Sequence, residues 1–218
     1  KYGWIVVGSN NAQNGPFEPI QAAIEAVGKD VEARFSIDPD RRYAAGFSGG
    51  ARVALYLGLG NRFAGVIPCG AGMPQGVALS NDQSATAVCA VVGGEDFNFI
   101  EVSAMVDEMR GRGFRARLDV FPDGHRWPPK ETAARGVRYM QLLWLAGRRD
   151  ESSAKELDAV MADEIVDAGT LLETPGGRLR GYRRLRELSE LCADGDRRDG
   201  ILRMMAEFEG DAGRLETE

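Results

Sequence analysis

Short apolar runs alternate with amphipathic stretches along the first two thirds of the chain, and this alternation limits the folds open to it. The runs have the composition of buried strands and lie at about 4–7, 43–47, 63–69, 86–92 and 117–121. Apolar residues at helical spacing predict helices at about 17–34, 50–57, 102–109 and 131–145. Strands that alternate with helices favour a mostly parallel sheet covered on both faces. We therefore predict a doubly wound α/β fold.

The strand pattern ends near residue 150, where the composition changes. Helical spacing continues in three stretches, at about 157–165, 179–191 and 201–208. We expect an α/β domain over residues 1–149 and an all-helical appendage over residues 150–218. The appendage would be one unit of a helical repeat array, and one unit shows no period, so membership in such an array stays open. A protein partner docked on this tail stays open as well.

Charge and hydropathy exclude two classes of partner. The net charge of the 218 residues is −6, whereas non-specific nucleic-acid binding needs a basic surface. The arginines between residues 178 and 186 have acidic residues around them, and such charges are typical of a solvated helix face. No apolar stretch reaches the roughly 20 residues of a membrane-spanning helix. We expect neither nucleic-acid binding nor a membrane span.

The three cysteines, Cys69, Cys89 and Cys192, lack metal-ligand spacing. Cys69 and Cys89 fall inside apolar strand-like runs, so we predict small buried side chains with free thiols. The sequence does not demand a Cys69–Cys89 disulfide and leaves it open. We expect no metal site.

Three residues with nucleophilic or acid–base chemistry each follow a predicted strand. Ser48 lies in Gly46-Phe47-Ser48-Gly49-Gly50, between a strand and a helix, and Asp96 follows the strand at 86–92. His125, the single histidine, follows the last strand. The carboxyl ends of parallel strands meet at one edge, where chemistry gathers in such sheets. We therefore expect these three side chains to meet.

A serine, an acid and a histidine suggest specific roles. Ser48 needs a base within hydrogen-bond reach to become a nucleophile, and His125 is the available imidazole. A carboxylate must orient the imidazole, and Asp96 is our choice, with Glu95 as runner-up. Asp123 stands too close to His125 in sequence and is expected to form the turn. The backbone N–H of Gly49 is the expected oxyanion donor.

These residues resemble a known family. Segments 37–50, 94–99 and 124–128 are similar to the nucleophile region, acid turn and histidine loop of bacterial α/β-hydrolase esterases. The polyhydroxybutyrate-depolymerase-like and feruloyl-esterase-like branch is the nearest in pattern, and dienelactone hydrolases are more distant. The resemblance covers residues 1–147 and includes the chain order serine, acid, histidine.

The family implies hydrolysis of small or polymeric carboxylic esters through an acyl-enzyme, without a metal or organic cofactor. It also makes a periplasmic or secreted location plausible. Family sheets carry strands before the one aligned to residues 4–7, and one of them precedes the loop with the second oxyanion donor. The resemblance thus implies an N-terminally truncated fold with a gap in the sheet between residues 4–7 and 43–47.

Substrate contacts are expected from Asn11, Phe47 and Trp127, which lie in or beside the strand-end loops. The polar loop that contains Asn11 and Asn14 is equally typical of an ordinary surface loop, and aromatics at strand ends are equally typical of core.

Two other functions fit the same residues. A serine peptidase of the prolyl-oligopeptidase kind uses the same triad order. A non-catalytic binding protein would use the helical tail for a partner and the hydrolase part as a scaffold.

Overall fold

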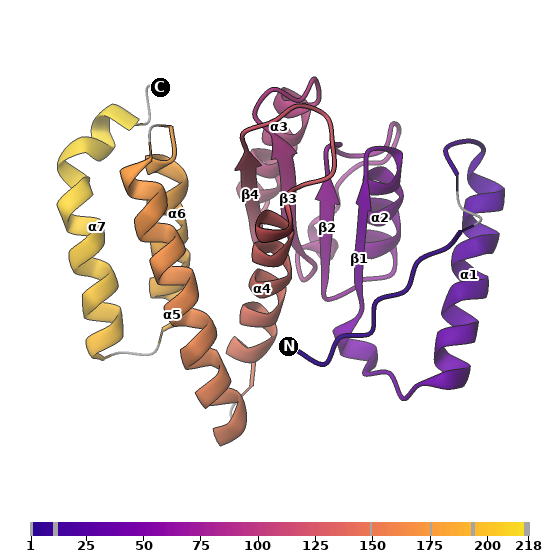
Figure 1. Cartoon of the computed structure of the whole chain (residues 1–218), viewed down its shortest axis with the longest axis horizontal. Coiled ribbons are helices and arrows are strands. Elements are labelled where there is room, and N and C mark those ends of the chain that lie inside the picture. Colours follow the sequence, from indigo (N-terminus) through magenta and orange to yellow (C-terminus); the bar gives the residue numbers. More distant parts are fainter. Residues whose placement is uncertain (1, 11–12, 149, 175, 193–194, 216–218) are drawn as a thin grey trace. The chain divides into compact units, whose positions relative to one another are not determined.

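The computed structural model describes residues 2–10, 13–148, 150–174, 176–192 and 195–215. The chain forms two compact units, Lys1–Met140 and Gln141–Glu218, and each is described by itself (Figure 1). The division falls inside helix α4 (Lys130–Ala146), whereas the boundary predicted after residue 149 lies beyond the end of that helix.

The first unit is built on a four-stranded parallel sheet in the order β1-β2-β3-β4 (Figure 1). The strands are β1 (Tyr43–Phe47), β2 (Gly65–Cys69), β3 (Ala87–Gly93) and β4 (Ala116–Phe121). The helices are α1 (Phe17–Arg34), α2 (Gly49–Gly60), α3 (Phe99–Gly111) and α4, with two 3-10 turns at Pro39–Arg41 and Asn81–Gln83. The α/β class is confirmed, and the four strands lie within two residues of their predicted positions.

Helices cover both faces of this sheet, which explains the continuous apolar runs. Val66 and Val88, paired in register, are buried in the core that α2 and α3 form. Ile67 and Cys89 alternate with them and contact α4 at Gly136. Every residue of β2 and β3 is buried, as expected for strands between two helical layers. The fold is doubly wound, as predicted.

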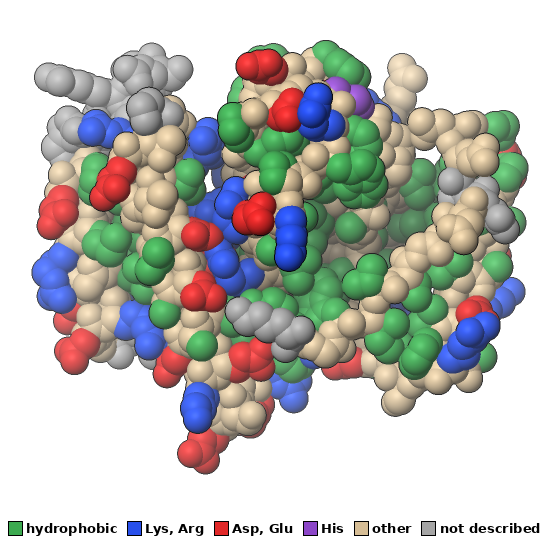
Figure 2. All heavy atoms as spheres, viewed as in Figure 1, with side chains coloured by type: hydrophobic (Ala, Val, Ile, Leu, Met, Phe, Trp, Pro, Cys, Tyr) green, Lys and Arg blue, Asp and Glu red, His purple; other side chains and the backbone are tan. Residues whose placement is uncertain are grey.

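The segment at residues 4–7 is not a strand, and this prediction was wrong. Among the described residues, the sheet contains only the four strands above, with β1 at its edge. The Trp4 ring stacks on Tyr43 of β1 at 4.3 Å, while Val6 is 88% exposed. The apolar sequence favours burial, but a strand also needs backbone hydrogen bonds to a neighbouring strand, and residues 4–7 join no strand of the sheet. Figure 2 shows hydrophobic side chains gathered at this surface.

The second unit packs three helices in sequence, α5 (Glu151–Glu173), α6 (Arg178–Leu191) and α7 (Asp196–Leu215). All three predicted helices are confirmed and extend further than the apolar pattern indicated. Their buried apolar residues are Val160, Met161, Ala168, Leu172, Leu185, Leu188, Ile201 and Met205. In Figure 2 charged side chains of both signs are interspersed over these helices, as expected for a solvated surface.

A capping interaction fixes the start of α5. The Asp150 carboxylate accepts hydrogen bonds from the backbone N–H of Ser153 at 2.9 Å and from its hydroxyl at 2.7 Å. These bonds, with Ser153 as the main cause, lower the pKa of Asp150 to about 2. The cap defines where the helix begins.

Cys69 and Cys89 are buried and free, as predicted, so the disulfide left open above is not formed. In the part of the chain that the structure describes, no helix combines the length and apolarity needed to cross a bilayer.

Packing in the core between α2 and the sheet is expected to contribute to the free energy of unfolding. Leu55 is fully buried in that core, so Leu55→Ala is expected to lower the free energy of unfolding by about 2–5 kcal/mol through lost contacts and a cavity. Ile100→Ala, at a site that is 76% exposed, is the control and should change it by less than about 0.5 kcal/mol. Urea denaturation measures both, and equal effects would contradict the described core.

Candidate active site

Ser48 occupies a strained turn between β1 and α2. Its φ is 55° and its ψ is −118°, a conformation that costs a non-glycine residue about 1–3 kcal/mol. The Ser48 N–H donates to the carbonyl of Cys69, at the end of β2, at 2.8 Å. That bond and the following helix hold the turn, which directs the hydroxyl outward beyond the edge of the sheet.

The two outer glycines of the serine motif differ in what they contribute. A Cβ at Gly46 would lie 2.2 Å from the Gly50 carbonyl oxygen, so strand and helix approach too closely for any side chain there. A Cβ at Gly50 would meet no atom within 4 Å. The close approach of strand and helix therefore requires glycine at position 46, whereas position 50 has room for a side chain.

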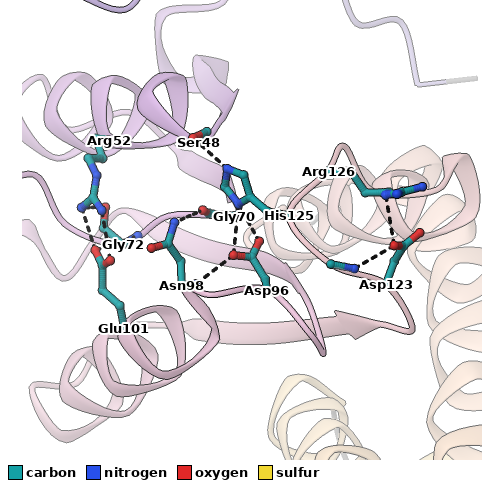
Figure 3. A network of polar contacts seen from close by, with 11 residues as sticks. Ser48, Arg52, Gly70, Gly72, Asp96, Asn98, Glu101, Asp123, His125 and Arg126 are labelled. Carbon is teal, nitrogen blue, oxygen red and sulfur yellow. Dashed lines mark hydrogen bonds and ion pairs between the residues drawn. The ribbon is translucent and has the colours of Figure 1, made fainter.

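The three predicted residues meet at one edge of the sheet, each after a different strand (Figure 3). His125 Nε2 lies 3.0 Å from Ser48 Oγ. On the other side of the ring, His125 Nδ1 lies 3.0 Å from Oδ1 and 2.9 Å from Oδ2 of Asp96. The arrangement is a continuous row of hydrogen bonds from hydroxyl to imidazole to carboxylate.

Among the three acids considered from sequence, only Asp96 reaches the imidazole. Its side chain is fully buried, whereas that of Glu95 is exposed. Asp123 accepts the backbone N–H of Gly124 at 2.7 Å and pairs with Arg126, so it fixes its own turn, as Figure 3 shows.

A second hydrogen-bond chain holds the Asp96 carboxylate. The backbone N–H of Asn98 donates to Asp96 Oδ1 at 2.8 Å, and the Asn98 side chain donates to the Gly70 carbonyl at 2.7 Å. Gly70, with φ 67°, in turn donates its N–H to Val91. The carboxylate is thereby tied to the ends of β2 and β3.

An ion pair beside the triad was not found from sequence. Arg52 on α2 binds both carboxylate oxygens of Glu101 on α3, at 2.6 and 3.0 Å (Figure 3). Arg52 also donates to the Met73 carbonyl, and Glu101 accepts the N–H of Gly72. The pair clamps the loop after β2. Its partners are 49 residues apart, and no local pattern links them.

Aromatic rings surround His125. Phe47 lies 4.7 Å from the imidazole and 5.3 Å from the Trp127 ring, and Phe97 lies 4.3 Å from the imidazole, measured between centroids. Phe97 and Trp127 are 77% and 64% exposed, so they border the site from the solvent side. Phe99, by contrast, packs against the core.

The amino end of α2 carries the remaining polar groups. Gly49 is the first residue of the helix, so its N–H has no acceptor within the helix. The Asn14 amide lies against it, since a Cβ at Gly49 would be 2.2 Å from Asn14 Oδ1. Asn11, expected as a substrate contact, lies outside the described residues.

In the described residues, neither a reactive thiol nor a cluster of metal-binding side chains accompanies this row of hydrogen bonds. Burial raises the pKa of the Cys69 thiol to about 12, so this thiol stays protonated and does not compete with Ser48. Within the described residues, no group of three or more His, Cys, Asp or Glu side chains is arranged to hold a metal ion.

Comparisons with known proteins found partial similarity to solved structures at low sequence identity. No protein-family model matches the sequence, and no curated protein matches it. The esterase PE8 is similar with a TM-score of 0.42 and 21% identity, over 53% of this chain and 57% of its own. The S-formylglutathione hydrolase FrmB from Staphylococcus aureus, as apoenzyme, is similar with a TM-score of 0.40 and 16% identity, over 56% and 57%. The match thus spans little more than half of each of those chains.

The close approach at Gly46 makes the turn testable. Gly46→Ala is expected to shift the start of α2 and destabilise the protein, because its Cβ would collide with backbone at Gly50. Gly28→Ala, in helix α1 with open space around it, is the control and should be neutral or stabilising by up to about 1 kcal/mol. Thermal unfolding compares the two, and an unchanged Tm in Gly46→Ala would refute the described turn.

Proposed function

We propose that this protein is a serine hydrolase that cleaves carboxylic esters through an acyl-enzyme. The observation that carries the proposal is the unbroken row of hydrogen bonds through Ser48, His125 and Asp96. Such a row provides a nucleophile, a base and an orienting acid in the chain order of α/β-hydrolases.

In the first half of the reaction, Ser48 Oγ attacks the ester carbonyl carbon while His125 Nε2 takes its proton. The imidazolium is stabilised by Asp96, whose carboxylate is buried and aimed at Nδ1. The carbonyl oxygen becomes negatively charged beside the N–H of Gly49, which has no acceptor within helix α2. The C–O bond to the alcohol then breaks, and His125 protonates the leaving oxygen.

In the second half, water replaces the alcohol beside His125. Nε2 takes a proton from this water, whose oxygen attacks the acyl carbon, and the proton then passes to Ser48 Oγ as the acid leaves. The same nitrogen serves in both halves, which the 3.0 Å distance to Oγ permits.

The leaving alcohol departs on the side of His125, where the aromatic side chains gather. Phe47 and Trp127 are proposed as substrate contacts there, together with Phe97, which also lies against the imidazole. The finer assignment, to polyhydroxybutyrate-depolymerase-like or feruloyl-esterase-like enzymes with small or polymeric ester substrates, rests on the resemblance of the three motif segments.

Labelling by a fluorophosphonate probe tests the nucleophile. We expect the wild-type protein to be labelled, and we expect Ser48→Ala and His125→Ala to abolish both labelling and p-nitrophenyl acetate turnover. Peptide p-nitroanilides measured in parallel separate an esterase from a peptidase of the same triad. A folded protein that is never labelled would exclude both enzymes and favour the non-catalytic alternative.

The identity of the acid gives a separate prediction with a matched control. Asp96→Asn is expected to lower kcat by roughly 10³–10⁴-fold, because an amide can no longer hold the imidazole in the required tautomer. Glu95→Gln changes the adjacent, exposed side chain in the same way and should leave kcat within about twofold. Steady-state kinetics on p-nitrophenyl acetate decide, and a larger loss in Glu95→Gln would move the orienting role to Glu95.

A further inference from the structure

A cavity of about 350 Å³ lies next to the amino end of α2, within the first unit. This size falls in the range of small-molecule pockets. Its walls are mostly apolar and come from α1, α2 and the loop after β2, through Phe17, Ile20, Val53, Tyr56, Pro74 and Val77. Asn14 and Gly49 line it as well, and the contact between them places both at the same end.

The cavity follows one face of α2 away from the nucleophile. Gly49, Val53 and Tyr56 are spaced by four and then three residues and therefore share a face of the helix. Seven residues of helix separate Gly49 from Tyr56, which corresponds to about 10 Å along the axis. The Phe17 ring packs edge-on against Tyr56 at 4.8 Å, and both residues line the far end.

The chemistry of the proposed reaction connects this groove to the substrate. The carbonyl oxygen of the ester lies at the Gly49 N–H, so the acyl group begins beside the residue that forms the near end of the groove. The alcohol lies toward His125 and its aromatic neighbours instead. The groove therefore extends from the acyl side of the ester bond.

The charge state of the lining favours a neutral, apolar occupant. Arg52 is the charged lining residue, and both of its terminal nitrogens bind the Glu101 carboxylate. A substrate carboxylate would have to displace that pair, whereas an alkyl chain would gain from burial against the apolar walls.

We propose that this groove is the acyl-binding pocket and that it selects esters of medium-length, straight-chain aliphatic acids. This inference rests on the proposed function. Val53 forms its side wall and Tyr56 its far end, so these two residues set the length of chain that fits.

The test is the chain-length profile of kcat/KM on p-nitrophenyl acetate, butanoate, hexanoate and octanoate. In the wild type we expect kcat/KM to rise by up to about fourfold for each added methylene until the groove is full. Val53→Phe should abolish that rise by filling the groove, so that kcat/KM no longer increases from the acetate to the octanoate. Tyr56→Ala should shift the optimum to a longer chain by opening the far end.

Val166→Phe, the same substitution at a 68% exposed site on α5, is the control and should keep the wild-type profile. A flat wild-type profile, or variants that change all four esters equally, would overturn the groove while Ser48-dependent acetate turnover still supports the esterase. If Val53→Phe loses turnover of the acetate as well, the position of the chain-length optimum in Tyr56→Ala is the deciding result. Absence of any Ser48-dependent turnover would overturn the pocket and the proposed function together.

Discussion

The parallel register of four strands is the constraint on which the site depends. Phe47 pairs with Cys69, Cys69 with Val91 and Gly93 with Phe121, so the strands end nearly level. Residues that follow different strands then meet without any long loop to carry them. A shift of one strand by one residue would turn its side chains to the opposite face and move its loop by about 3.3 Å, more than a hydrogen bond tolerates.

Around that edge, the polar network extends beyond the catalytic row. Asn98 connects Asp96 to the loop after β2, and the Arg52–Glu101 pair holds the same loop from the other side (Figure 3). The Asp96 carboxylate that orients the imidazole is thus itself held by Asn98, whose side chain is anchored to the loop after β2. Such support is what allows a hydroxyl and a carboxylate to keep their distances to a small ring that is itself one-fifth exposed.

The sequence predicted the four strands and the meeting of Ser48, Asp96 and His125 because both follow local rules. Strands buried on two faces read as apolar runs, and a parallel sheet brings their ends together. Residues 4–7 have the same apolar composition and yet form no strand, and Val6 is 88% exposed. A strand needs backbone hydrogen bonds to a neighbouring strand, which apolar composition alone does not provide. The Arg52–Glu101 clamp and the Asn14–Gly49 contact depend on distant segments, and nothing in either local sequence marks them.

The edge position of β1 has a consequence for how the protein behaves in concentrated solution. One side of β1 pairs with β2, and within the described residues its other side joins no strand. Unpaired backbone along an edge can template the addition of a strand from another molecule, and natural sheets counter this by keeping such strands short. At five residues β1 offers only a brief template, so its shortness is itself a safeguard against self-association.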